Sequence, residues 1–288
     1  MMEHASSQIG FLHPGQMGAA LARIVKDNGH EAWWLADQRS PATAERAAAA
    51  GLKDAGSLAA LCQQCAIIVA ICPPHGALEV AQGVAACGFS GLYLEANAIS
   101  PATARQIAET IAGGGGTYVD AAVIGPPPRE GQASRLYLAG DKGAALAHCF
   151  AAPCLAVEWL GPHTERASAL KMCHSALHKG RFALLLAALA AADHFGVEQE
   201  LERCLSGPGA QRGGWHDPAE TLRRSAKGWR FAGEMQEVAA TMALAGLPAG
   251  LHQAAAEIFA RLPRPSHEAD GQANQLALPD LLEAVQKP

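Results

Sequence analysis

Residues 8–18 read Gln-Ile-Gly-Phe-Leu-His-Pro-Gly-Gln-Met-Gly, and the expected fold class follows from this segment. A short apolar strand runs into a turn with the pattern of the glycine fingerprint G-x-G-x-x-G, except that histidine takes the place of the first glycine. Gly15 stands where the second glycine lets a pyrophosphate approach the backbone, and Gly18 stands where the third allows close packing of helix on strand. His13 is at the tight-turn position, where histidine accepts unusual backbone angles more readily than most residues.

The surroundings of this turn match the context that the fingerprint requires. It follows a strand, it opens an amphipathic helix, and a second strand begins about 20 residues further on. The N-terminus of a helix offers N–H groups and the positive end of its dipole to a phosphate. The sequence therefore predicts a dinucleotide site that includes His13, Pro14, Gly15, Gln16 and Met17. The alternative is a glycine-rich turn that binds nothing.

Short β-branched runs alternate with alanine-rich helical runs from residue 8 to about residue 158, which is typical of a parallel sheet wound with helices. Strands are expected at Gln8–Leu12, Glu31–Leu35, Ala66–Ile71, Gly91–Glu95, Thr117–Ala122 and Arg135–Leu138. Helices are expected at Gln16–Asn28, Pro41–Ala50, Ser57–Gln63, Gly76–Cys87, Pro101–Ile111 and Lys142–Cys149. From about Glu165 onward the pattern is helical only, and the residues after Pro263 are expected to form a loosely held tail.

This pattern predicts an α/β chain of two domains. Residues 1–160 are expected to form a Rossmann-type, doubly wound parallel sheet that binds the nucleotide. Residues 161–288 are expected to form an all-α domain for substrate binding and dimerisation.

The composition of the 288 residues restricts the class of protein. Half of the residues are apolar and 17% are charged, which excludes a disordered chain. The net charge is −5 without a basic block, so neither nucleic acid nor an anionic membrane is an expected partner. The N-terminus lacks a secretory signal, and the longest apolar run, Phe182–Ala192, is about half of what a bilayer crossing needs, so a cytoplasmic protein with a buried helix is expected. Cys62 and Cys65 have no second pair of ligands at metal spacing, so the eight cysteines are expected to be free thiols and no metal is assigned.

The choice of nicotinamide cofactor depends on the end of the second strand, which reads Asp37-Gln38-Arg39-Ser40. Asp37 alone would favour NAD. Arg39 and Ser40, however, offer a guanidinium and a hydroxyl to a 2′-phosphate, at the start of a helix whose N-terminus also favours an anion. NADP(H) is therefore the expected cofactor, and the alternative is an exposed arginine beside a helix cap.

Together these residues resemble the β-hydroxyacid dehydrogenase and 6-phosphogluconate dehydrogenase superfamily. The likeness is strongest to a bacterial branch of NADP oxidoreductases with an uncharacterised C-terminal helical domain. The segments that resemble the superfamily are, in order, 9–18, Cys72-Pro73-Pro74-His75, Glu95-Ala96-Asn97-Ala98-Ile99-Ser100-Pro101, 120–127 and Lys171. The segments typical of the bacterial branch are His13-Pro14-Gly15, 97–101, Lys171-Met172 and 227–235. Ile124 and Pro126 depart from the usual substrate-binding segment of the family, which puts the usual small hydroxyacid substrates in doubt.

The resemblance implies roles for particular residues. Cys72, Pro73 and Pro74 would border the cofactor, and Asn97 would approach the nicotinamide. The implied substrate-binding residues are Ser100, Gly125, Pro126 and His174. The alternative for these positions is ordinary loop structure. Helical second domains of this kind usually build dimers, so a homodimer is expected.

Lys171 resembles the catalytic lysine of the superfamily and lies in a mostly apolar helical stretch. Burial would lower its pKa toward the working range, so Lys171 is expected to act as general acid in reduction and as general base in oxidation. Ser175, one helical turn further on, is expected to hydrogen-bond the lysine or the substrate. The alternative is a lysine whose aliphatic stem lies along the helix while its amine reaches solvent.

The predicted function is hydride transfer between NADP(H) and a β-hydroxyacid-like or keto acid small molecule. An imine reductase and an oxidative decarboxylase remain open within the same superfamily. A non-catalytic NADP-binding sensor is the alternative from a different class.

Overall fold

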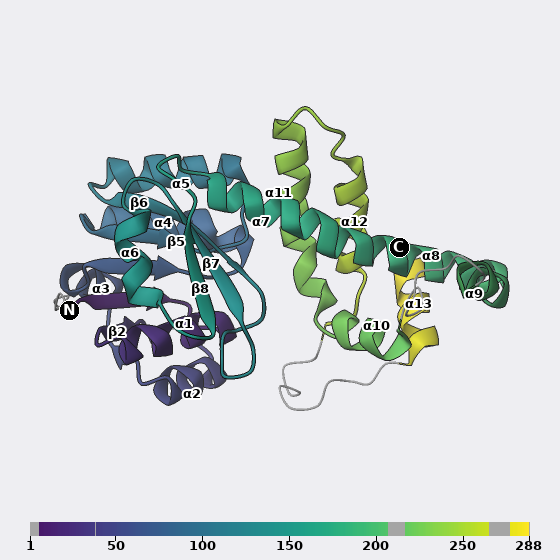
Figure 1. Cartoon of the computed structure of the whole chain (residues 1–288), viewed down its shortest axis with the longest axis horizontal. Coiled ribbons are helices and arrows are strands. Elements are labelled where there is room, and N and C mark those ends of the chain that lie inside the picture. Colours follow the sequence, from purple (N-terminus) through teal and green to yellow (C-terminus); the bar gives the residue numbers. More distant parts are fainter. Residues whose placement is uncertain (1–5, 38, 207–216, 265–276, 288) are drawn as a thin grey trace. The chain divides into compact units, whose positions relative to one another are not determined.

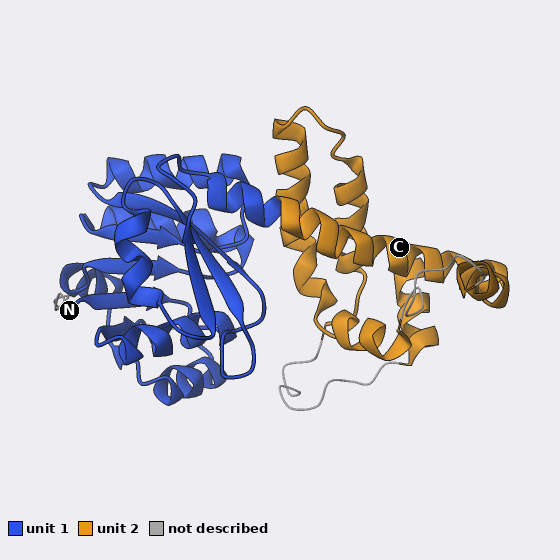
Figure 2. Cartoon of the chain, in the orientation of Figure 1, with its two compact units in different colours: residues 1–172 blue, residues 173–288 orange. Residues whose placement is uncertain are grey.

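The computed structural model describes residues 6–37, 39–206, 217–264 and 277–287. The chain divides into two compact units, residues 1–172 and residues 173–288 (Figure 2). Each unit is described by itself below.

Unit 1, residues 1–172, is built on one eight-stranded sheet with the order β3-β2-β1-β4-β5-β6-β7-β8 (Figure 1). All neighbouring strands are parallel except β6 and β7, which are antiparallel. The strands are β1 Gln8–Leu12, β2 Glu31–Trp34, β3 Lys53–Asp54, β4 Ile67–Ala70, β5 Leu92–Glu95, β6 Thr117–Ile124, β7 Ser134–Ala139 and β8 Leu155–Trp159. The predicted doubly wound α/β fold is confirmed.

Helices cover both faces of this sheet (Figure 1). They are α1 Gln16–Asp27, α2 Pro41–Ala49, α3 Leu58–Gln64, the short 3-10 turn Pro74–Gly76, α4 Ala77–Ala86, α5 Pro101–Gly113 and α6 Gly143–Phe150. Strand β4 shows why both faces are buried: Ile67 and Val69 pack into one hydrophobic cluster with residues of α1 and α6, whereas Ile68 and Ala70 pack into the other with residues of α4 and α5. Successive side chains of a strand point to opposite faces, so a strand that is apolar at every position needs cover on both.

Three features of the sheet differ from the expected pattern. β3 was not predicted, because it is only two residues long and both, Lys53 and Asp54, are exposed polar residues. β8, Leu155–Trp159, was also not predicted, and most of its residues are not fully buried. β7 runs antiparallel to β6, whereas the alternation of strands and helices had indicated parallel strands throughout. The two strands are joined by the loop 125–133 without a crossover helix, which allows the reversed direction.

In unit 2, residues 173–288, every secondary-structure element among the described residues is a helix. Helix α7, Arg166–Ser175, begins in unit 1 and continues through a π-helical turn, Ala176–Gly180, into α8, Arg181–Phe195. The other helices are α9 Glu198–Ser206, α10 Pro218–Ser225, the 3-10 turn Gly228–Arg230, α11 Phe231–Leu244, α12 Gly250–Ala260 and α13 Leu278–Gln286. Phe259 is fully buried and stacks on Phe182 at 6.0 Å between ring centroids, with Phe231 edge-on at 5.3 Å.

The expectation of a loose tail after Pro263 is wrong for residues 278–286, which form α13. Leu281, Leu282 and Val285 are buried on one face of this helix. Its last residue, Gln286, donates to the carbonyl of Ala190 on α8 at 2.9 Å. The helical spacing of Leu281, Leu282 and Val285 is a weak signal in a segment that follows several prolines.

Among the described residues, the continuous stretch Arg166–Phe195 is long and apolar enough by composition to cross a membrane. In its most apolar window, 44% of the residues are buried inside the protein, and core helices of soluble proteins have the same composition. The run that was predicted to be a buried helix lies in α8, where Phe182, Leu186 and Leu189 are buried. This part of the prediction is confirmed.

Candidate dinucleotide-binding and active site

The turn between β1 and α1 has the geometry of an anion-binding site. His13 has a φ of +62°, the left-handed conformation that the first glycine of the fingerprint usually provides. A Cβ on Gly18 would come within 2.9 Å of Ile71, so glycine is required there for the close approach of helix and strand. Gly15 caps α1 without any side-chain hydrogen bond, and the first turn of the helix contains no acidic residue. The N–H groups at this end of α1 therefore face a position that suits a phosphate.

Beside this turn lies a cleft of about 390 Å³. Its lining includes the predicted cofactor residues His13, Arg39, Cys72 and Pro73, together with His75. Among the described residues, buried Nδ1 of His13 and buried Nε of Arg39 have no hydrogen-bond partner. Burial and then the positive charge of Arg39 lower the pKa of His13 to about 4, so its ring is neutral at pH 7. Unpaired polar atoms in the lining of the cleft suit a polar ligand, and the guanidinium of Arg39 suits an anionic one.

Ser40 has a structural use as well as the predicted one. Its Oγ accepts from the N–H of Thr43 at 3.3 Å and thereby caps α2. Arg46, on the next turn, donates to the hydroxyl of Thr43 at 3.0 Å, and its buried Nε has no partner in the described part of the chain. Arg39 precedes the N-terminus of α2 and lines the cleft, whereas Arg46 lies in the last turn of this helix.

Asn97 connects the loops that follow β4 and β5. It is only 3% exposed, and its Oδ1 accepts the backbone N–H of Cys72. Its own N–H donates to Oε1 of Glu95 at 2.9 Å. This arrangement fixes the orientation of the amide and leaves buried Nδ2 without a partner among the described residues. The Cys72 thiol has its pKa raised to about 12, mainly by burial, and is therefore not a thiolate.

Two buried carboxyl groups lie behind these loops, and the sequence analysis gave neither of them a role. Glu95 ends β5, Asp120 lies opposite it in β6, and both are fully buried. Asp120 accepts from the hydroxyl of Ser168 at 2.5 Å and from its N–H at 2.9 Å. Burial raises the pKa of Glu95 to about 8 and that of Asp120 to about 6, and the hydrogen bonds from Ser168 oppose the shift of Asp120. The signal that could have indicated them is an acidic residue within or at the end of an otherwise apolar strand.

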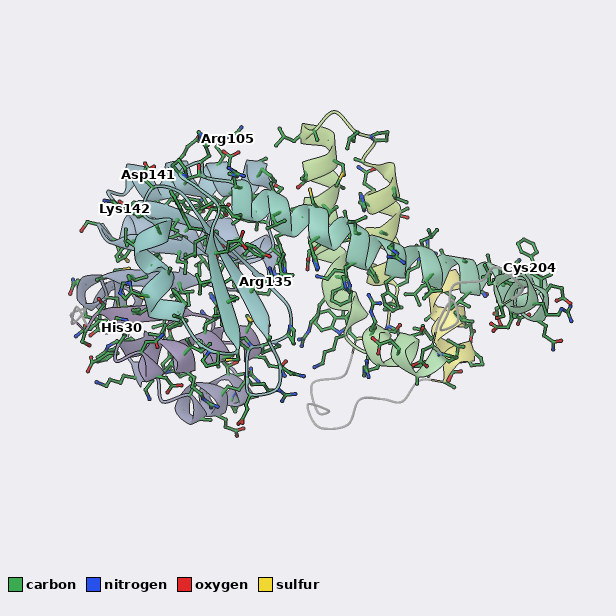
Figure 3. The ribbon with its side chains drawn as sticks, viewed as in Figure 1. His30, Arg105, Arg135, Asp141, Lys142 and Cys204 are labelled. Carbon is green, nitrogen blue, oxygen red and sulfur yellow. The ribbon has the colours of Figure 1, made fainter. Side chains whose placement is uncertain are left out.

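The start of α7 is anchored at two points. Asp120 holds Ser168 in the first turn of the helix, as described above. Glu165, just before the helix, has a φ of +74°, which is uncommon for a residue with a side chain. Arg105, which lies at the outer surface of unit 1 (Figure 3), forms a bidentate pair with Glu165, with both N···O distances at 2.9 Å. The helix that carries Lys171 therefore begins from a fixed point.

Lys171 lies one turn into α7 from Ser168. Its Nζ donates to the carbonyl oxygen of Val123 at 2.7 Å, and the bond is partly buried. Val123 is near the carboxyl end of β6, and β1, β4, β5 and β6 are parallel. The Lys171 amine therefore lies at the carboxyl ends of the strands, where the turn at His13 also begins. The structure thus places Lys171 at the same end of the sheet as the predicted nucleotide site.

The predicted substrate residues of unit 1 lie in turns and helix caps. Ser100 is buried, and its Oγ accepts from the N–H of Thr103 at 3.2 Å to cap α5. Gly125 has a φ of +124°, and a Cβ there would lie 2.5 Å from Oγ of Ser134. Ser134 donates to the carbonyl of the exposed Pro126. These contacts explain the residue types structurally, and the roles of Ser100, Gly125 and Pro126 in substrate binding stay predictions.

The remaining predicted site residues belong to unit 2. Ser175 donates to a carboxylate oxygen of Glu234, and Lys179 forms an ion pair with the other oxygen of the same carboxylate. His174 stacks on His178, with 5.1 Å between ring centroids. Glu234 lies 59 residues along the chain from Ser175, so the sequence could not indicate this partner. Because the Ser175 hydroxyl donates a hydrogen bond to Glu234, its oxygen can still accept one from another group.

His30, His148 and Cys149 form a group whose candidate ligand atoms lie within 4.8 Å of one another. The Nδ1 of His30, however, accepts the backbone N–H of Ser7 at 3.2 Å. The neutral ring therefore carries its proton on Nε2, and neither nitrogen offers a lone pair to a metal. We assign no metal to this group.

Residues 8–151 match the family model described as the NAD binding domain of 6-phosphogluconate dehydrogenase. The chain belongs to this family. Residues 192–262 match a second model, a domain of unknown function (DUF1932). The resemblance stated from the sequence is thereby confirmed, and unit 1 is a Rossmann-type domain for NAD or NADP.

Several known proteins are similar to this chain. The uncharacterised 28.5 kDa protein in the 7S RNA 5′ region of Methanothermus fervidus is 28% identical over 196 residues, 67% of this chain and 74% of that protein. The structure of 3-hydroxyisobutyrate dehydrogenase from Mycobacterium tuberculosis has a TM-score of 0.67 at 18% identity, over 98% of this chain and 100% of that one. An imine reductase from Streptomyces aurantiacus has a TM-score of 0.52 at 17% identity, over 97% of this chain and 100% of that one. At these identities the solved structures show a common fold.

Proposed function

We propose that this protein is an NADP-dependent oxidoreductase that interconverts a β-hydroxyacid-like small molecule and its keto form. The observation that carries the proposal is the position of Lys171, whose amine is bonded to the carbonyl of Val123 at the nucleotide-binding edge of the sheet. The similarity in fold to a 3-hydroxyisobutyrate dehydrogenase supports the same class of reaction.

Different residues would bind the cofactor and transfer the proton in this reaction. The first turn of α1, with Gly15 as its cap, would hold the pyrophosphate, and Arg39 would pair with the 2′-phosphate of the adenosine ribose. The bound nicotinamide would supply or accept the hydride. Lys171 would donate a proton to the carbonyl oxygen during reduction and accept it back during oxidation. Ser175, one turn further along α7, would accept a hydrogen bond from the lysine or the substrate.

The preference for NADP predicts a selective effect of Arg39→Ala. This change should raise the KM for NADPH about 10- to 100-fold, because a charge-assisted bond to a phosphate is worth about 1.5–3 kcal/mol. The KM for NADH should stay nearly unchanged, since NADH has no 2′-phosphate. Steady-state kinetics with both cofactors measures the difference, and Arg23→Ala, an exposed arginine on α1, is the matched control. Equal losses with both cofactors would refute the choice of NADP.

The reaction class is tested by following NADPH absorbance with three sets of acceptors: keto acids, aldehydes and cyclic imines. Oxidation of NADPH with a keto acid, with formation of the hydroxy acid, is the expected result. Preferential turnover of imines would assign an imine reductase, and release of carbon dioxide in the oxidative direction would assign a decarboxylase. Binding of NADPH without oxidation by any acceptor would overturn the proposal in favour of a sensor.

We also propose that the protein works in the cytoplasm as a homodimer that assembles through unit 2. The large apolar side chains that are exposed lie mostly in this unit, among them Leu184, Phe195, Leu244, Leu247 and Leu251. Exposed apolar side chains at such density usually mark an interface. Light scattering should give twice the chain mass of 29.8 kDa, and the mass of a single chain would contradict the proposal.

A further inference from the structure

We propose that Glu95 is a neutral carboxylic acid that positions Asn97, and through it the loop at Cys72, for the bound dinucleotide. This inference rests on the proposed function in one respect, because it takes the loops after β4 and β5 to contact the cofactor. The charge state of Glu95 is a separate part of the proposal and is tested without any cofactor.

The positioning follows from an unbroken series of hydrogen bonds. Oε1 of Glu95 accepts the N–H of Asn97 at 2.9 Å, and Oδ1 of Asn97 accepts the N–H of Cys72. The ends of β5 and β4 are thus tied together through one amide side chain. Its orientation is fixed, because only its oxygen can accept from Cys72, and Nδ2 is left buried and without a partner among the described residues. A buried, oriented donor without a partner is costly in a protein alone and is suited to an acceptor on a ligand.

The surroundings of Glu95 favour its neutral form. Its side chain is fully buried, and the groups that interact with it are the Tyr93 hydroxyl on β5, the Tyr118 hydroxyl and the Asp120 carboxyl on β6, the Cys72 thiol after β4, and Asn97. None of these is a cation. Asp120 accepts hydrogen bonds from the N–H and the hydroxyl of Ser168 and from the hydroxyl of Tyr118, whereas Glu95 accepts one from the N–H of Asn97. Of two adjacent buried carboxyls, the one with fewer donors retains the proton.

The sign of the pH dependence follows from these surroundings. The pKa of Glu95 is raised from 4.5 to about 8 by burial first and by Asp120 among the smaller causes. Because the folded-state pKa is raised, the stability that the protonated group contributes is fully present below pH 4.5 and is lost as the pH rises through 8. Glutamine has the shape and the neutral charge of the protonated acid, so Glu95→Gln should remove this dependence.

The first arm of the experiment measures thermal unfolding of the full chain without cofactor between pH 5 and pH 9. The gain in midpoint temperature of Glu95→Gln over the parent should be larger at pH 8.5 than at pH 5, by about 5 °C or more. Glu109→Gln, an exposed glutamate on α5, is the control and should show no such divergence. If the difference in midpoint temperature between Glu95→Gln and the parent stays constant from pH 5 to pH 9, the proposal that Glu95 is a neutral acid is overturned.

The second arm measures NADPH binding by fluorescence titration. Glu95→Ala and Asn97→Ala should each weaken binding about tenfold or more at pH 7, and the conservative Glu95→Gln should restore it to within about threefold of the parent. Above pH 8 the affinity of the parent should fall while that of Glu95→Gln does not, a difference that a purely structural role would not produce. Unchanged affinity in Glu95→Ala would overturn the positioning role, and failure of that variant to fold leaves the glutamine comparison to decide.

The two arms separate this inference from the proposed function. A parent protein that binds neither NADPH nor NADH would refute the proposed function, and with it the positioning part. The unfolding arm would still decide whether Glu95 carries its proton at neutral pH.

Discussion

Replacing Lys171 by methionine is expected to lower kcat about 10²- to 10⁴-fold, the usual contribution of general acid–base catalysis. Methionine retains most of the aliphatic length of lysine but cannot donate or accept a proton. The bond from Nζ to Val123 is lost, yet it lies at the end of β6 and is only partly buried, so the fold should persist. Stopped-flow or steady-state measurement of NADPH oxidation provides the rate, and the KM for NADPH should change little.

The matched control for this change is Lys142→Met, which removes an exposed lysine of the same unit. It should leave kcat within about twofold of the parent, because Lys142 is exposed and is not among the residues that line the cleft beside His13. Circular dichroism and the thermal midpoint show whether each variant is folded. A folded Lys171→Met protein with turnover within tenfold of the parent would mean that another group moves the proton.

The change Gly15→Asp is expected to weaken NADPH binding about 100- to 1000-fold without destabilising the protein. A Cβ on Gly15 meets no atom within 4 Å, so the side chain fits. Gly15 is the cap of α1 in an extended conformation, a position that aspartate favours, so stability should stay equal or rise by a few tenths of a kcal/mol. The new carboxylate, however, would stand where the pyrophosphate belongs, and two negative charges at about 4 Å repel by about 4 kcal/mol near a protein surface.

Gly15→Asn separates charge from shape in this prediction. Asparagine is as large as aspartate and is an equally good cap, but it is uncharged, so its loss of affinity should be at least tenfold smaller. Isothermal titration with NADPH compares the two variants, and thermal unfolding checks their stability. Equal losses for aspartate and asparagine would show that the turn is not an anion site.

The turn at residues 13–18 was predictable because its requirements are local. Three features depend only on neighbours in the chain and on the adjacent strand. They are the left-handed backbone of His13, the N-cap of α1 at Gly15, which has no side chain, and the close packing of Gly18 on Ile71. Strand β1 and the start of α1 agree with the structure to the residue for the same reason. The short strand β3 and the reversed β7 depend instead on pairing between distant segments, which no local pattern specifies.

The site shows the same division between local and long-range information. Arg39 could be singled out from its immediate sequence, and Lys171 from the resemblance to the superfamily. The partners that orient the site could not, since Asp120 meets Ser168 across 48 residues and Asn97 meets Cys72 across 25. Ser100 illustrates a different limit, because a serine before proline indicates a helix cap and a substrate contact equally well.

A crystal structure of the protein with NADP⁺ would show whether the Lys171 amine can exchange a proton with a substrate beside the nicotinamide. We expect the nicotinamide ring at the carboxyl ends of β5 and β6, with room for a small molecule between its reactive carbon and Nζ of Lys171. A nicotinamide bound elsewhere, or a Lys171 amine turned to bulk solvent in every copy, would contradict it.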